Sequence, residues 1–315
     1  MMTRSGPADR PRQPIVVGYS ATATGQDALA LGIALAREQN ADLHIVLVAP
    51  EDSGFSPSHG YDRSYDGILL DQMQDWLTDA LTGVPDDVRA TCHVASATNA
   101  AEGLLAAARA LGAGVITIGS RSGGLLRSHR IGSMASALLH SSDIPVALAP
   151  TGYHQPGPIG RVTTMFGQRR GATDVIAVGL ETARDRDIPL RLVSIVMIDE
   201  PDTDVPSDTA GINMKVVNEV HSYATARLAA EAEEKVTDRT ATAVVATGRS
   251  VPEALHDLDW RDDEIVLVAS SRLAADGRLF LGKTATTMLR ATPVPMVIVP
   301  AGWSHPGTTD PRQED

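Results

Sequence analysis

Short apolar segments alternate along this chain with segments of helical periodicity. The apolar runs occupy residues 15–19, 43–48, 90–96, 114–119 and 145–149, and then 161–166, 190–197, 241–247, 264–269 and 295–299. Between them, apolar side chains recur at helical spacing, as at Ile68, Leu69, Met73, Trp76, Leu77, Ala80 and Leu81. Strands that are apolar throughout and separated by helices predict a parallel sheet covered by helices on both faces.

The pattern occurs twice. Residues 30–48 and 177–196 share a helix, an Ala-Arg pair, a polar turn and a strand, and residues 142–150 match 292–300. This repetition predicts α/β architecture with two tandem doubly wound domains. The predicted boundaries are a tail at 1–13, a first domain at 14–150, a Gly/Pro-rich linker at 151–161, a second domain at 162–302 and a tail at 303–315. Both tails are polar and contain proline, so we expect them to be disordered.

The amino-acid composition argues against several classes of function. A net charge of −12 and a pI near 5.2 argue against binding to nucleic acid or to an anionic membrane. No apolar run reaches the roughly 18 residues that a membrane helix needs. The single cysteine, Cys92, excludes an intramolecular disulfide and fits a reducing compartment, so we expect a cytoplasmic protein. Because Cys92 lies in a strand-like run, we expect it in the core rather than at a catalytic site.

One loop has the features of a phosphate site. Gly119 closes the fourth strand of the first copy, and Gly132 and Ser133 open its last helix. Glycines and a helix N-terminus at the carboxyl edge of a parallel sheet present free N–H groups to an anion. Further candidates within the loop are Arg121, Arg127, His129 and Arg130. The alternative is a tight strand-to-helix connection with solvated side chains.

This segment resembles the nucleotide loop of the universal stress protein family, G-x2-G-x9-G-[S/T], followed by a short helix and a P-V-x-V-x strand. Gly119, Gly132 and Ser133 match, whereas Ser122 stands at the second glycine. The resemblance extends over both copies, across nearly all of residues 14–301. It implies a five-stranded parallel sheet of order 3-2-1-4-5 in each copy, with ATP as the ligand of the members that bind a nucleotide.

The resemblance also implies the site residues. They are Gly18, Tyr19, Ser20, Val48 and Ile118 on the adenosine side, and Gly119, Ser122, Gly132, Ser133 and Met134 on the phosphate side. Nucleotide-binding relatives usually have Asp where this chain has Ser20, and a hydroxyl lacks the charge of that acceptor. Two functions therefore stay open: an ATP-binding stress-response regulator with little or no turnover, and a protein-interaction module that binds no nucleotide.

A second motif, GRLFLGKT at residues 277–284, fits the P-loop pattern of an ATPase. A P-loop has its first glycine at the end of a strand, whereas Gly277 lies in the middle of a predicted loop. The matching loop of the second copy also has Ser270 and Leu273 in place of two family glycines. We therefore expect a degenerate second site and rank a P-loop ATPase last, although Lys283 at a helix start could attract an anion.

The sequence indicates neither metal binding nor catalysis. The nine histidines show no pair at metal-ligand spacing, and no nucleophile is placed with its base, so we predict neither a metal site nor an enzyme. The last strand of each copy is an apolar run bounded by prolines, at what should be a sheet edge. In relatives this strand pairs across a dimer, which implies an intrachain pseudo-dimer here.

Overall fold

The fold is described from a computed structural model of the chain. It describes residues 13–51, 63–120, 131–154, 157–167, 172–198, 214–223, 226, 241–270, 279–300 and 303, with the backbone alone over 63–70 and 172–174. All ten predicted strands are confirmed, each within one or two residues of its expected ends.

The described residues of the first half form nine elements in alternating order. They are β1 (Ile15–Gly18), α1 (Ala23–Gln39), β2 (Leu43–Pro50), α2 (Arg63–Thr82), β3 (Ala90–Ala97), α3 (Ala100–Ala110), β4 (Val115–Gly119), α4 (Ser133–Ser141) and β5 (Val146–Ala149). Local sequence explains two of the helix starts, because the side chains of Thr22 and Asn99 accept backbone N–H bonds from the first turns of α1 and α3.

The second half repeats the order. Its labelled elements are β6 (Arg161–Met165), α5 (Ala172–Arg186), β7 (Leu190–Met197), β8 (Ala241–Gly248), α7 (Val251–His256), β9 (Glu264–Ala269), α8 (Lys283–Ala291) and β10 (Met296–Val299). Residues 214–223, between β7 and β8, are helical as well.

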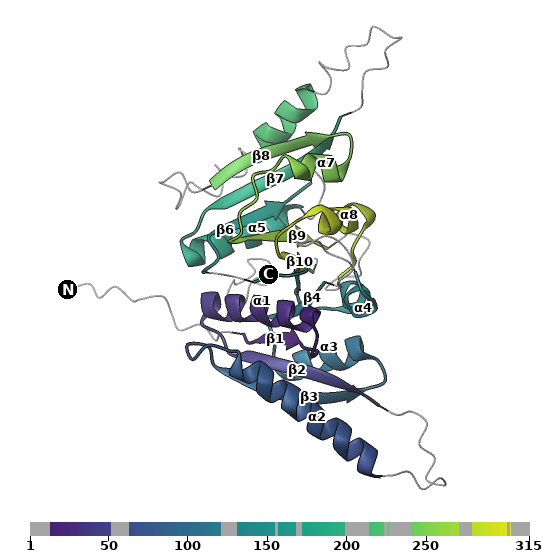
Figure 1. Cartoon of the computed structure of the whole chain (residues 1–315). Helices are drawn as coiled ribbons and strands as arrows, with labels where there is room; N and C mark the ends of the chain where they lie inside the picture. Colours follow the sequence, from purple (N-terminus) through teal and green to yellow (C-terminus); the bar gives the residue numbers. More distant parts are fainter. Residues whose placement is uncertain are drawn as a thin grey trace, which may run out of the picture.

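All ten strands form one sheet with the order β3-β2-β1-β4-β5-β10-β9-β6-β7-β8. Within each half the neighbours are parallel and follow the order 3-2-1-4-5. Figure 1 shows the two halves end to end, with β3 and β8 at opposite ends of the molecule. Two buried clusters cover the faces: α1, α2 and α5 contribute to one, and α3, α4, α7 and α8 to the other.

The halves meet through their last strands. β5 and β10 pair antiparallel, with Val146 opposite Ile298 and Leu148 opposite Met296. Every residue of both strands is buried. The outer strand β3 instead mixes half-buried and exposed residues, and β8 is half-buried except at the exposed Thr242 and the buried Ala246. The two fully apolar strands therefore cover each other, and the partly polar strands face solvent.

Cys92 is less buried than expected. It lies on β3, and because β3 is an outer strand the residue is half-buried at the rim of the core. Its thiol donates a hydrogen bond to the Leu77 carbonyl at 3.4 Å. Burial raises the pKa of the thiol, which lowers its reactivity at neutral pH.

Residues of the predicted linker at 151–161 are hydrogen-bonded to the first half. The Gly152 N–H donates to the buried Asp27 carboxylate of α1 at 3.0 Å, and the Ile159 N–H donates to Glu38 at 2.9 Å. Burial raises the pKa of Asp27, although backbone N–H donors partly oppose this shift. Trp303, assigned to the C-terminal tail, is half-buried against the core.

Candidate functional site

A cavity of about 210 Å³ lies at the carboxyl ends of β1 and β2. It is close to the point where the strand order reverses between β1 and β4, where open α/β sheets bind ligands. Its lining residues are Gly18, Tyr19, Ser20, Ala21, Val46, Leu47, Val48, Met73, Trp76, Leu104 and Met134. None of these described lining residues is charged, so this part of the cavity suits an uncharged, largely apolar group.

The structure brings together half of the residues that were expected at the site. Those in the lining are Gly18, Tyr19, Ser20, Val48 and Met134. Ile118 lies beside Gly18, since a Cβ built on that glycine would be 3.1 Å from Ile118 Cγ2. Gly119 ends β4, and Gly132 and Ser133 begin α4, whose Met134 reaches the cavity.

Ser122 and the candidates Arg121, Arg127, His129 and Arg130 lie outside the described residues.

Six lining residues were not expected at the site: Ala21, Val46, Leu47, Met73, Trp76 and Leu104. Met73 and Trp76 of α2 were assigned only to a core-facing helical stripe, and Leu104 of α3 was not considered. The stripe is partly confirmed, because Met73 is buried and Trp76 half-buried, whereas Leu81 is 40% exposed. Apolar periodicity shows which face of a helix turns inward, but it does not distinguish a packed core from the wall of a cavity.

The polar groups at the cavity have local partners. The Tyr19 hydroxyl accepts a hydrogen bond from Gln26 Nε2 at 3.0 Å, and burial raises the pKa of this phenol, with Asp79 adding to the shift. The exposed Ser20 hydroxyl lies 2.9 Å from the Thr22 hydroxyl. Neither group is a strong base at neutral pH.

The N-terminus of α4 lies next to the cavity and has no side-chain cap. Gly132 is the N-cap residue, with extended backbone (φ −80°, ψ 174°) that any residue can adopt. The first turn contains no acidic residue. The N–H groups of this turn and the positive end of the helix dipole can therefore interact with an anion.

Gly119 has a packing role whatever the ligand. A Cβ at this position would lie 2.0 Å from the Thr24 carbonyl oxygen in the first turn of α1. Only glycine permits this approach between the end of β4 and α1. The presence of a glycine at residue 119 is therefore explained without a phosphate.

The second half has a bulkier side chain at the corresponding place. Tyr19 N–H donates to the Val46 carbonyl, and Phe166 N–H makes the matching bond to Val193, both at 2.9 Å. These bonds align Gly18 at the end of β1 with Met165 at the end of β6. Met165 is buried, with 3% exposure. At the aligned position of the first half a Cβ on Gly18 would lie 2.5 Å from Leu104 Cδ2, so only the second half has a side chain at this place.

Two of the described backbone N–H groups of the P-loop-like segment have partners within the protein. β9 ends at Ala269, and Gly277 lies outside the described residues. Leu279 and Leu281 are buried, and the N–H groups of Leu279 and Phe280 donate to the Ser142 carbonyl and the Ser270 hydroxyl, both at 2.7 Å. These donors are therefore already used within the protein.

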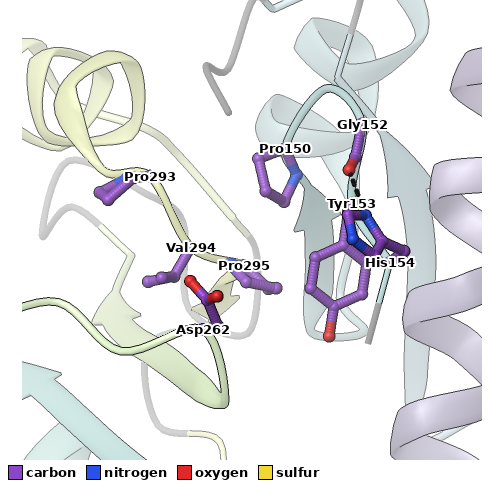
Figure 2. Close-up of a pocket in the computed structure, with 8 residues that line it drawn as sticks. All are labelled: Pro150, Gly152, Tyr153, His154, Asp262, Pro293, Val294 and Pro295. Atoms are coloured by element: carbon purple, nitrogen blue, oxygen red, sulfur yellow. Dashed lines mark hydrogen bonds between the residues drawn. The ribbon is translucent and has the colours of Figure 1, made fainter. Parts of the chain in front are cut away.

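A second cavity lies at the junction of the halves. Figure 2 shows it between the Pro150–His154 turn and a wall made by Asp262, Pro293 and Pro295. Its volume is about 20 Å³, which is room for a water molecule and too little for an organic ligand. Burial raises the pKa of Tyr153 in this turn.

Two histidines meet on neighbouring strands of the first half. His44 Nδ1 on β2 lies 2.9 Å from His93 Nε2 on β3, and both side chains are half-buried. No sequence pattern indicates this pair, because its members are 49 positions apart in the chain. Among the described residues no group of three or more His, Cys, Asp or Glu could hold a metal ion.

The pair predicts a pH-dependent stability. Burial, and then the neighbouring His93, lower the pKa of His44 below its usual value, with Asp42 partly opposing the shift. The folded state therefore favours the neutral ring. The contribution of neutral His44 to the stability of the fold is complete above about pH 6.5 and is lost as the pH falls through the folded pKa.

Urea unfolding between pH 7.5 and 5 should show a loss of stability that His44→Gln reduces. The matched control His154→Gln, at an exposed histidine, should keep the wild-type slope. An unchanged slope in His44→Gln would contradict the prediction.

Within the described part of the chain, no helix combines the length and apolar character needed to span a bilayer.

Comparison with known proteins gives consistent matches. The profile of the universal stress protein family matches residues 11–150 and 167–300. Universal stress proteins of Mycobacterium tuberculosis and Mycobacterium bovis are 26% identical over 295 residues, covering 91% of this chain and 99% of theirs.

Solved structures agree in fold. A universal stress protein from Archaeoglobus fulgidus has a TM-score of 0.59 at 15% identity, covering 91% of this chain and 98% of its own. One from Pseudomonas aeruginosa, described as putative, has a TM-score of 0.56 at 16% identity, covering 92% and 93%.

Proposed function

Because the chain belongs to the universal stress protein family, we propose that its first half binds an adenine nucleotide, with ATP as the ligand, and that the chain acts as a stress-response regulator. The observation that supports this function is the cavity at the ends of β1 and β2, with the uncapped N-terminus of α4 beside it. An apolar cavity and an anion-binding helix end are the two environments that a nucleotide requires.

The cavity fits part of a nucleotide. Its volume of about 210 Å³ is below the roughly 300–1,000 Å³ of pockets that enclose a whole ligand. We therefore place the base and the sugar inside, against Val48, Trp76 and Met134. The phosphates would lie outside, at the first turn of α4, where Ser133 can also donate its hydroxyl.

We propose that the site binds without turnover. Among the described lining residues, Tyr19 and Ser20 carry hydroxyl groups, and the raised pKa of Tyr19 keeps this phenol protonated at neutral pH. An ATPase based on the P-loop-like segment is disfavoured because the backbone donors of Leu279 and Phe280 are used within the protein. We propose no matching site in the second half, which has the buried Met165 at the position of the cavity residue Gly18.

A second candidate is a protein-interaction module that binds no nucleotide. It is favoured by Ser20, which stands where nucleotide-binding relatives usually have Asp and whose hydroxyl interacts with Thr22. In either case we propose that the chain works in the cytoplasm as an intrachain pseudo-dimer, since β10 covers the edge of β5 within one chain.

Calorimetric titration of the full chain with ATP tests the proposal. Gly132→Val should weaken binding roughly tenfold or more, a loss of about 1.4 kcal/mol per factor of ten. The reason is steric: the valine side chain would occupy the space through which phosphate oxygens approach α4, while the extended backbone at residue 132 tolerates it.

The second half offers a matched control. Gly282 is the N-cap of α8 with nearly the same backbone (φ −69°, ψ 168°), so Gly282→Val makes the same change away from the cavity. We expect Gly282→Val and Lys283→Ala to leave ATP affinity unchanged. Loss of binding in Lys283→Ala with retention in Gly132→Val would refute the proposal in favour of a P-loop. No ATP binding by the wild type would favour the interaction module.

A further inference from the structure

The P-loop-like segment contacts a helix of the other half. Leu279 N–H donates to the Ser142 carbonyl at 2.7 Å. The Phe280 ring meets the His140 ring edge-on, with centroids 5.1 Å apart and an interplanar angle of 89°. His140 is in the last turn of α4 and Ser142 is its C-cap residue. Residues 279–281 of the second half therefore contact the C-terminal end of α4.

The segment is itself anchored. Leu279 and Leu281 are 1% and 5% exposed and belong to the buried cluster that contains Leu138 and Leu139 of α4. Phe280 N–H donates to Ser270 Oγ at 2.7 Å, directly after β9. The segment is thus fixed to the sheet of the second half, and its contact with α4 is not a loose surface contact.

The other end of α4 borders the cavity. Gly132 caps the helix, and Met134 in its first turn lines the cavity. α4 has nine residues, so its ends are only about 13 Å apart. A hydrogen-bonded helix of this length moves as one body, and fixing its last turn also fixes its first.

We propose that residues 279–281 of the second half position α4 and thereby organise the ligand site of the first half. This inference rests on the proposed function in so far as the ligand is a nucleotide. It gives the second half a role as an in-chain positioning element, with Phe280 and Leu279 as positioning residues that touch no ligand. The GRLFLGKT segment then serves to join the two halves rather than to hold a phosphate.

Hydrogen exchange and titration of the full chain test the proposal together. In Phe280→Ala we expect faster amide exchange over residues 133–141 and ATP affinity lowered about fivefold or more. Phe280→Tyr, which keeps the ring, should restore both values. The matched control is Leu255→Ala, a buried residue of α7, which packs on β7, β8 and α8. It should destabilise the second half without changing exchange in α4.

A double-mutant cycle tests the ring contact. His140→Ala should reproduce the effects of Phe280→Ala, and combining the two should add little. Unchanged exchange in α4 of Phe280→Ala, or an equal increase in Leu255→Ala, would overturn the inference. Faster amide exchange in α4 of Phe280→Ala with unchanged ATP affinity would overturn the proposal that these residues organise the ligand site. A wild type that binds no ATP would refute the proposed nucleotide, and the exchange comparison would still decide whether residues 279–281 position α4.

Discussion

Glu264→Gln is expected to lower the free energy of unfolding by about 3–5 kcal/mol, the usual cost of removing one partner of a buried ion pair. The Glu264 side chain is fully buried between two arginines, with Arg161 at 2.5 Å and Arg191 at 2.6 Å. It also accepts hydrogen bonds from the Thr163 hydroxyl and from the Arg261 N–H. A neutral amide would leave the buried Arg191 guanidinium and the half-buried Arg161 guanidinium without their carboxylate.

Urea unfolding followed by circular dichroism measures the effect. The matched control is Asp263→Asn, because Asp263 pairs with Arg261 at 2.6 Å but both side chains are more than a third exposed. This change should cost no more than about 1 kcal/mol. Equal losses in the two variants would contradict the argument from burial.

The cluster of Arg161, Arg191 and Glu264 is not required by the fold. Strand register aligns His44 with Arg191, and Gly114 with Glu264, so the first half lacks the cluster. The triple replacement Arg161→Met, Arg191→Leu, Glu264→Leu should therefore cost less than Glu264→Gln alone, because it leaves no buried charge unpaired. A larger loss in the triple variant would show that the cluster stabilises the second half outright.

Deletion of residues 151–315 is expected to give a dimer or an insoluble product. β5 is completely buried, and without β10 its apolar residues and backbone groups would form an open sheet edge. A second copy of the first half can cover this edge in the same antiparallel arrangement. Light scattering measures the mass of the product.

A complementation experiment serves as the control. Separately expressed residues 151–315, added during refolding, should convert the product into a one-to-one complex, because β10 restores the native partner of β5. A well-behaved monomer of residues 1–150 would contradict the prediction that this edge needs a partner.

The sequence by itself determined the elements and their class. Strand positions followed from continuous apolar runs, and the start of α4 followed from Gly132 and Ser133. The tandem organisation followed from the repeated pattern. These features depend on residues close together in the chain, since a β-branched run, a turn or a helix start is decided within a few positions.

The ligand site was only partly determined in this way. The glycines and strand ends pointed to the carboxyl edge of the first sheet, and five of the ten expected residues line the cavity found there. Trp76 was expected in the core, because an inward-facing helical position has the same pattern at a cavity wall. Gly119 proved to be required by its contact with Thr24, a packing role that a motif cannot separate from binding.

Only the tertiary structure decided which distant residues meet. It placed His44 against His93, enclosed Glu264 between Arg161 and Arg191, and set Phe280 against His140. The members of these contacts lie 49 to 140 residues apart in sequence, and no local pattern encodes them. Their energies depend on burial and on the register between strands, which exist only once the sheet has formed.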